Sequence, residues 1–302
     1  MDTLLPTSLQ HLDGTVGIWT ACHESLPATQ CSDAALEIES LGYAAMWIPE
    51  AWGRESISSA SLLLSKTSRL VIATGIMNIY GRDAVATAAS SKTLNAAYSD
   101  RFVLGLGVSH RPLVEGLRGQ TYPSPVSTMR AYLAAMDAAP MMAPESQQRV
   151  GRVIAALGPK MLEVATTAAD GAHPYLVTPE HTATARAAVG DKFVGVEQAV
   201  VLGQSREEFL RRAHAHLEIY TGLDNYRNSW LRLGFTQEDF VRGGSDRLCD
   251  ALVVHGDESR IRDAVNEHRQ AGANHVCLQV LGADMFAPPM DEWRIIAPAV
   301  TS

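Results

Sequence analysis

The chain has 302 residues, of which 46% are hydrophobic and 19% are charged, and its formal net charge is −8. An acidic chain is not expected to bind nucleic acid, because such binders carry a basic surface. No apolar run reaches the roughly 20 residues that a membrane helix needs, and the first residues lack the basic and apolar regions of a secretory signal. We therefore expect a cytoplasmic protein that does not bind membranes.

Short apolar runs alternate with longer amphipathic runs along the whole chain. The expected strands, in chain order, are residues 16–19, 45–48, 70–76, 102–107, 153–157, 171–173, 193–202 and 275–280. The expected helices are residues 33–41, 58–67, 84–98, 128–138, 160–169, 179–189, 206–220, 259–271 and 291–296. Eight apolar strands that alternate with helices predict an α/β fold, a (β/α)₈ barrel with strands buried on both faces. We expect one domain over residues 1–302.

In such a barrel the functional residues lie at the carboxyl ends of the strands. Glu50 and Trp52 follow the second expected strand. A carboxylate can accept a hydrogen bond from the edge of a flat polar ring, and an indole can stack on its face. The alternative is an exposed loop acid beside a core tryptophan.

The third expected strand is followed by Gly75, Asn78 and Arg82. A glycine lets the backbone approach a ligand closely, and an asparagine side chain offers both a donor and an acceptor. Arg82 could meet an anion. An ordinary connecting loop would explain the same residues.

The fourth expected strand ends in a glycine-rich run that includes Gly107, Ser109 and His110. The run begins like the dinucleotide motif G-x-G-x-x-G, but His110 stands at the last glycine and the segment lies too late to open a Rossmann unit. His110 is a candidate proton donor, because imidazole titrates near working pH. A structural histidine is the alternative.

The fifth expected strand leads into Gly158 and Pro159. Proline is favoured at the first position of a helix, where its missing N–H has no cost. The N–H groups of Lys160 and Met161 are then expected to lack partners inside the helix, and the positive helix end and the Lys160 charge favour a phosphate there. A simple helix start would look the same. His173, after the sixth strand, either lines the pocket or ends the strand.

Metal and hydrolase sites are not indicated. The four cysteines have no C-x-x-C spacing and are expected to be free thiols. His214 and His216 are two residues apart on an expected helix, so they point to different faces. No G-x-S-x-G segment is present.

Several of these segments resemble one known family. Residues 42–50 resemble the second-strand motif of the luciferase-like oxidoreductases, and residues 101–108 look like their fourth-strand signature. Residues 158–162 and 169–175 are similar to the fifth and sixth units of the F420-dependent branch of that family. The resemblance covers residues 14 to 282, approximately.

The resemblance implies a luciferase-like (β/α)₈ barrel with a helical insertion after strand seven, at about residues 204–246. It implies that the ring of coenzyme F420, or of FMN as the alternative, lies in the barrel mouth. It also implies a non-proline cis peptide bond between Gly75 and Ile76, a small-molecule substrate and a homodimer.

The chain departs from the family at two positions. The F420 enzymes of the family carry an Asp-His pair after strand two, where this chain has Glu50 and Ala51. They often carry an acidic Glu after strand four, where this chain has His110. These departures leave the general acid and the substrate open.

The resulting hypothesis is hydride transfer between C5 of the deazaflavin and a small organic substrate. His110 and Glu50 are the expected catalytic residues, and the substrate pocket is expected to include Trp19, Trp52 and His173. The expected cofactor-binding residues are Glu50, Gly75, Ile76, Asn78, Gly107, Ser109, Gly158, Pro159, Lys160 and Met161. The alternatives are an FMN-dependent monooxygenase and a non-catalytic barrel that binds a flavin or F420.

Overall fold

A computed structural model describes residues 4–51, 53–98, 100–144, 146–284 and 287–301. Its strands are β1 (Thr15–Trp19), β2 (Ala45–Ile48), β3 (Val71–Thr74), β4 (Met77–Asn78), β5 (Phe102–Gly107), β6 (Gly151–Ile154), β7 (Gly171–Ala172), β8 (Phe193–Leu202), β9 (Val253–Gly256) and β10 (His275–Val280). Before β8 the α-helices are α1 (Thr7–Gln10), α2 (Cys22–Ser25), α3 (Ala28–Ser40), α4 (Ser56–Lys66), α5 (Ala84–Ala97), α6 (Pro125–Asp137), α7 (Pro159–Ala168) and α8 (Pro179–Val189). After β8 they are α9 (Arg206–Leu217), α10 (Asp224–Arg232), α11 (Asp246–Leu252), α12 (Glu258–Gln270) and α13 (Met290–Val300).

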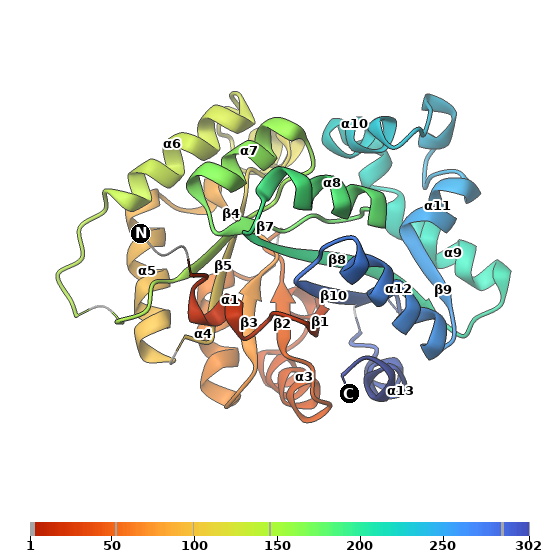
Figure 1. The fold of residues 1–302 in the computed structure, drawn as a ribbon, viewed down its shortest axis with the longest axis horizontal. Helices are drawn as coiled ribbons and strands as arrows, with labels where there is room; N and C mark the ends of the chain where they lie inside the picture. Colours follow the sequence, from red (N-terminus) through yellow and green to blue (C-terminus); the bar gives the residue numbers. More distant parts are fainter. Residues whose placement is uncertain (1–3, 52, 99, 145, 285–286, 302) are drawn as a thin grey trace.

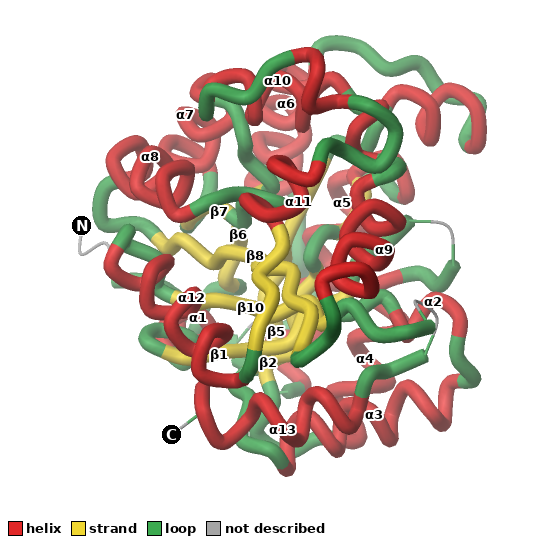
Figure 2. The backbone as a smooth tube through the Cα atoms, turned by 90° about the vertical axis from the view of Figure 1, so that its right-hand side faces the viewer, coloured by secondary structure: helices red, strands yellow, loops and turns green. Residues whose placement is uncertain are grey.

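Eight parallel strands close into a barrel. They are hydrogen-bonded in the order β10, β1, β2, β3, β5, β6, β7 and β8. The last strand, β10, pairs with β8 over residues 275–280 against 195–200, which closes the ring. Figure 2 shows the strands inside a surrounding layer of helices. The predicted (β/α)₈ fold is confirmed.

Two further short strands extend the sheet. The two-residue β4 follows β3 and pairs with β5. The four-residue β9 pairs with residues 199–202 of β8. Strand β9 was not predicted from the sequence, because its segment Val-Val-His-Gly is short and three of its four residues are only half-buried.

The core has an inner and an outer part. All ten residues of β8 and all four of β2 are buried, as expected for strands covered on both faces. The barrel interior is packed by side chains such as Trp47, Val103 and Phe193. Burying a side chain like that of Phe193 stabilises the fold by about 1.5–3 kcal/mol.

The insertion after β8 has a small core of its own. It contains α9, α10 and α11, the short turns η3 (Tyr220–Gly222) and η4 (Gln237–Phe240), and then β9. Trp230, on α10, is fully buried there, and its indole N–H donates to the carbonyl of Leu176 at 3.2 Å. In Figure 1 the insertion lies on the right-hand side of the barrel. The predicted helical insertion is present, although it continues past residue 246 through α11 and β9.

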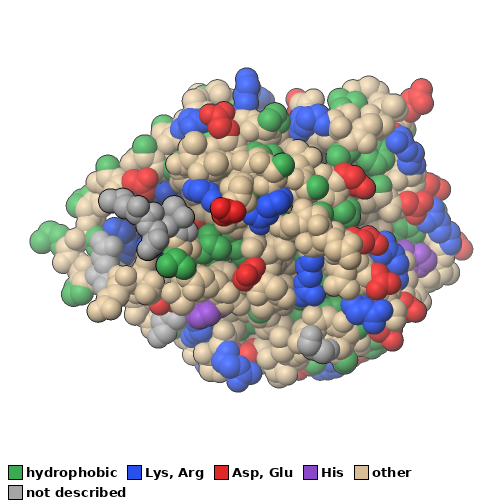
Figure 3. Space-filling view, in the orientation of Figure 1, with side chains coloured by type: hydrophobic (Ala, Val, Ile, Leu, Met, Phe, Trp, Pro, Cys, Tyr) green, Lys and Arg blue, Asp and Glu red, His purple; other side chains and the backbone are tan. Residues whose placement is uncertain are grey.

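The surface on one face carries both signs of charge. Figure 3 shows Lys and Arg side chains interspersed with Asp and Glu side chains. Among the residues that the structure describes, no helix is long and apolar enough to cross a membrane.

Candidate active site

Three predicted residues meet at the barrel mouth, around the end of β3. The peptide bond between Gly75 and Ile76 is cis, as the family resemblance implied. The Trp19 indole N–H donates to the Gly75 carbonyl at 2.7 Å. A Cβ atom on Gly75 would lie 2.9 Å from Trp19 Nε1 and 3.1 Å from His173 Nε2, so only glycine fits there.

His173 is held with one ring nitrogen unused. Its Nδ1 lies 2.8 Å from the Gly195 carbonyl, and its ring stacks on Trp47 at 4.3 Å. A carbonyl can only accept, so Nδ1 carries the proton and Nε2 is left as an acceptor. Nε2 is buried and has no partner within the described part of the chain. Burial lowers the pKa of His173 to about 4, so the ring is neutral near pH 7.

Ile76 and Gly107 are in contact across β3 and β5. A Cβ atom on Gly107 would lie 2.4 Å from Ile76 Cδ1, so Ile76 packs over the bare backbone of β5. Ser109 then adopts a positive φ of 55°, and its carbonyl accepts from the Tyr122 hydroxyl at 3.1 Å. This turn sets the direction in which the chain leaves β5 toward His110.

The Glu50 carboxylate is bonded to the segments that follow β2 and β3. It accepts from the backbone N–H of Asn78 at 2.8 Å and of Ser56 at 3.2 Å, and it forms an ion pair with Arg82. Its side chain is 6% exposed. Its predicted contact with a ring edge stays a prediction, but the bonds observed hold the loops after β2 and β3 together. Trp52 lies outside the described residues.

The Asn78 side chain also forms a hydrogen bond within its own loop. Its Oδ1 accepts from the backbone N–H of Tyr80 at 2.9 Å and caps the short helix η1 (Ile79–Gly81). The acceptor half of this amide is therefore already used, and only its donor half remains for the predicted ring contact.

His110 is half-buried against the insertion. Its ring lies 5.9 Å from the Tyr226 ring, and its side chain is hydrogen-bonded to Asn225. Burial lowers the pKa of His110, and the bond with Asn225 offsets this in part. The imidazole is therefore neutral near pH 7 and can accept a proton.

The turn before α7 has the features of a phosphate site. Gly158 is the N-cap residue, Pro159 is at the first position, and no side chain caps the helix. The expectation that the Met161 N–H is free is wrong, because it donates to the Gly158 carbonyl at 3.0 Å. Lys160 is exposed beside the turn. A Cβ atom on Gly158 would meet only an Arg232 nitrogen, at 3.7 Å, so the backbone is accessible.

Helix α10 links the two halves of the site. Its first turn carries Asn225 and Tyr226, which contact His110. Its last residue, Arg232, donates to the Leu157 carbonyl at 3.2 Å, next to the Gly158 turn. These residues were not predicted from the sequence, although the i, i+4 spacing of Tyr226 and Trp230 indicates an amphipathic helix.

A tyrosine from the loop after β7 and one from the insertion lie together beside the barrel interior. The Tyr175 hydroxyl donates to Gln279 Oε1 at 2.7 Å and lies 3.0 Å from the Tyr220 hydroxyl. The Tyr175 ring lies 5.2 Å from that of Trp19. Beneath it, Glu197 is fully buried, accepts from the Leu176 N–H at 3.0 Å, and has its pKa raised by burial to about 8. This acid could not be singled out from the sequence, because it lies inside an apolar strand.

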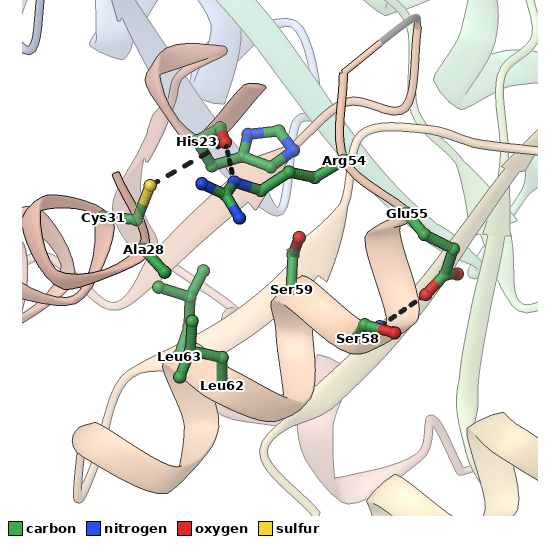
Figure 4. Close-up of a pocket in the computed structure, with 9 residues that line it drawn as sticks. All are labelled: His23, Ala28, Cys31, Arg54, Glu55, Ser58, Ser59, Leu62 and Leu63. Carbon is green, nitrogen blue, oxygen red and sulfur yellow. Dashed lines mark hydrogen bonds between the residues drawn. The ribbon is translucent and has the colours of Figure 1, made fainter. Parts of the chain in front are cut away.

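Two of the cavities outside this centre are lined by Arg54 and Glu55. One of about 270 Å³ lies between α3 and α4, where Arg54 donates to the carbonyls of His23 and Leu26 at 2.8 and 2.6 Å (Figure 4). Burial raises the pKa of Cys31, which lines it, so its thiol is not ionised at pH 7. The other cavity, of about 500 Å³, lies beside Glu50 and Arg82.

The sequence profile of the luciferase-like monooxygenase family matches residues 15–275. The chain belongs to the luciferase-like monooxygenase family. A Mycobacterium tuberculosis protein, provisionally named a coenzyme F420-dependent oxidoreductase, is 30% identical over 118 residues, which are 39% of this chain and 33% of that protein. The 5,10-methylenetetrahydromethanopterin reductase of Methanolobus tindarius is 27% identical over 192 residues, which are 57% of each chain. The chain thus covers between a third and three fifths of these two relatives.

Solved luciferase-like structures share the fold. An F420-dependent secondary alcohol dehydrogenase matches with a TM-score of 0.74 and 13% identity, over 96% of this chain and 99% of that one. The EDTA monooxygenase of Chelativorans sp. BNC1 matches with a TM-score of 0.73 and 10% identity, over 95% of this chain and 93% of that one. At such low identity these likenesses show the fold alone.

Proposed function

We propose that this chain is an F420-dependent oxidoreductase that transfers a hydride between C5 of the deazaflavin and a small organic substrate. One arrangement carries the proposal. The barrel mouth is lined by glycines, the start of α7 is accessible and flanked by cations, and α10 contacts both places. Relatives named for F420 chemistry support the choice of cofactor.

The residues at the mouth fit a phosphorylated flat ring. The unpartnered Nε2 of His173 is an acceptor for a ring or substrate donor, since a buried acceptor left unpaired is costly. Gly158, Pro159 and the N–H of Lys160 would hold the phosphate, with charge supplied by Lys160 and Arg232. Gly75, Ile76, Gly107 and Ser109 would form the floor beneath the ring.

Within this proposal the cofactor supplies or takes up the hydride, and the protein supplies position and proton control. His110, neutral at pH 7, would accept the hydroxyl proton of an alcohol substrate. Asn225 and Tyr226 would fix the imidazole in place. Glu50 would keep Asn78 and Arg82 at the rim through the bonds described above, and Trp19, Trp52 and His173 would line the substrate pocket.

An FMN-dependent monooxygenase on the same barrel is the alternative function. It is favoured by structural likeness to monooxygenases, one of them solved in complex with FMN at a TM-score of 0.67 and 14% identity. The same mouth and phosphate turn would serve FMN, which is also a phosphorylated tricycle.

Titration of the purified protein with F420, followed by fluorescence, tests the proposal. We expect saturable binding, and turnover of F420 with a panel of alcohols and carbonyl compounds. The same panel with reduced FMN under oxygen is the comparison. Oxygen-dependent product with FMN alone would overturn the F420 assignment, and F420 binding without turnover on any substrate would favour a non-catalytic carrier.

A further inference from the structure

A polar cleft of about 500 Å³ lies at the rim, among the loops that follow β2, β3 and β5. We call it the Arg118 cleft, and its charged and aromatic lining is Glu50, Arg54, Glu55, Tyr80, Arg82 and Arg118. It includes the Glu50–Arg82 pair, so it adjoins the elements that carry the candidate active site. The π-helix η2 (Pro112–Leu117) connects His110 to Arg118.

The two carboxylates of the Arg118 cleft are already paired. Arg82 bridges them, through its ion pair with Glu50 and through a contact of 2.5 Å with Glu55. Glu55 also caps α4, accepting from the N–H groups of Ile57 and Ser58 at 2.9 and 2.7 Å. Neither carboxylate is therefore free to neutralise another cation.

Arg118 is a cation without such a partner. Its side chain forms no ion pair or hydrogen bond with any residue in the described ranges, and its Nε is buried. Its guanidinium nitrogens lie 3.8 and 3.9 Å from the point where a side chain on Gly81 would begin, so Gly81 leaves it uncovered. The neighbouring Tyr80 hydroxyl is also buried and unpartnered.

The charges of the cleft favour an anion. Arg54 donates to main-chain carbonyls, which do not cancel its charge. The named lining therefore has three arginines against two glutamates, an excess of one positive charge. A guanidinium presents a planar fork that matches a carboxylate or phosphate, and the Tyr80 O–H can add a third donor.

We propose that the Arg118 cleft binds a carboxylate or phosphate group of a ligand that occupies the barrel mouth. This deepens the proposed function, on which it rests, because it makes an acidic compound the substrate class. The anion belongs either to the organic substrate or to an acidic side arm of the cofactor. Both sources present the same chemistry to Arg118 and Tyr80.

The first test needs no cofactor, so it is independent of the F420 assignment. Succinate and inorganic phosphate are titrated into the full chain by calorimetry. We expect millimolar or tighter binding that weakens with added salt, and a loss of about tenfold in affinity in Arg118→Gln, since hydrogen bonds to charged groups are the strong ones. Arg262→Gln, which removes an exposed arginine on α12, is the matched control and should bind as the wild type does.

Tyr80→Phe separates binding from folding. Its hydroxyl has no hydrogen-bond partner among the residues that the structure describes, so a structural role predicts unchanged anion affinity and an unchanged thermal midpoint. Anion binding predicts a severalfold loss of affinity with the midpoint unchanged. Absence of binding to the wild type at tens of millimolar, or equal binding by wild type and Arg118→Gln, would overturn the site.

Two further measurements identify the source of the anion. If the substrate carries it, Arg118→Gln raises KM for an acidic substrate and leaves F420 affinity unchanged. If the cofactor carries it, the same variant weakens F420 affinity. Either result supports the cleft.

Discussion

The protonation state of His110 can be tested through the pH dependence of turnover. Burial lowers its pKa below the ordinary 6.5, so the ring is neutral and able to accept a proton above that pKa. In the direction of alcohol oxidation, kcat should therefore rise with pH through a value below 6.5 and then stay level. A plateau that begins above pH 7 would contradict this reading.

Substitution of His110 separates proton transfer from binding. We expect His110→Gln to lower kcat by about 10²-fold or more, because general-base catalysis contributes on that order. F420 affinity should stay unchanged, since the imidazole is not placed on the phosphate side. His11→Gln, an exposed histidine near the N-terminus, is the control. Full turnover by the His110 variant would remove its proposed role.

Residues such as Gly75 and Gly107 could be singled out from the sequence, since a glycine at a strand end indicates close approach of backbone. The bonding partners of Glu50 could not be predicted from the sequence. Its partners are the side chain of Arg82 and the backbone N–H groups of Ser56 and Asn78. These bonds form only once the loops after β2 and β3 fold against each other, so no local sequence pattern predicts them.

At the level of elements, α10 contacts both His110 and the Gly158 turn, so within the proposed function it connects proton transfer to cofactor binding. Replacing Arg232 at its end should weaken F420 about tenfold, through the loss of a charged donor at the phosphate. A deazaflavin that lacks the phosphate should bind Arg232→Gln and wild type equally well. Fluorescence titrations with the two ligands measure the difference.

Arg262→Gln again serves as the control for loss of one positive charge. An equal loss for both ligands would show that Arg232 acts on the fold of the insertion and not on the phosphate.

The barrel strands could be predicted closely, because each is a short apolar run; residues 45–48, 102–107, 193–202 and 275–280 match β2, β5, β8 and β10 at both ends. The insertion could not be divided correctly. Its helices are short and polar on one face, and β9 exists only through pairing with β8, 54 residues earlier in the chain (Ala199 with Val253).

For the whole molecule, the buried titratable groups set the pH range of stability. Burial lowers the pKa of five histidines to values far below 6.5, to about 4 in His23, His173, His216 and His268 and to about 3 in His275. Their stabilising effect is complete above pH 6.5 and is lost as the pH falls from there toward 4. Glu197 acts oppositely: its pKa is raised to about 8, so its contribution is complete below pH 4.5 and is lost as the pH rises through 8.

We therefore expect the free energy of unfolding to be greatest near pH 6.5. Each group contributes a slope of up to about 1.4 kcal/mol per pH unit within its own range. Urea unfolding at pH 5, 6.5 and 8 measures the profile. Glu197→Gln should remove the decline on the alkaline side and make the rise from pH 5 to 6.5 steeper, because the opposing contribution of Glu197 already begins to fall above pH 4.5. A wild-type profile that is flat from pH 5 to 8 would contradict the assignment.

Strand β8 has two neighbours at once over Ala199 and Val200, which pair with β10 on one edge and with β9 on the other. Over these two residues the barrel and the insertion share the main chain of β8. The helices between β8 and β9 could therefore be lengthened, shortened or replaced while the ring of eight strands stays closed. Changes in the insertion that ends in β9 would thus leave the eight-stranded ring closed by β10 undisturbed.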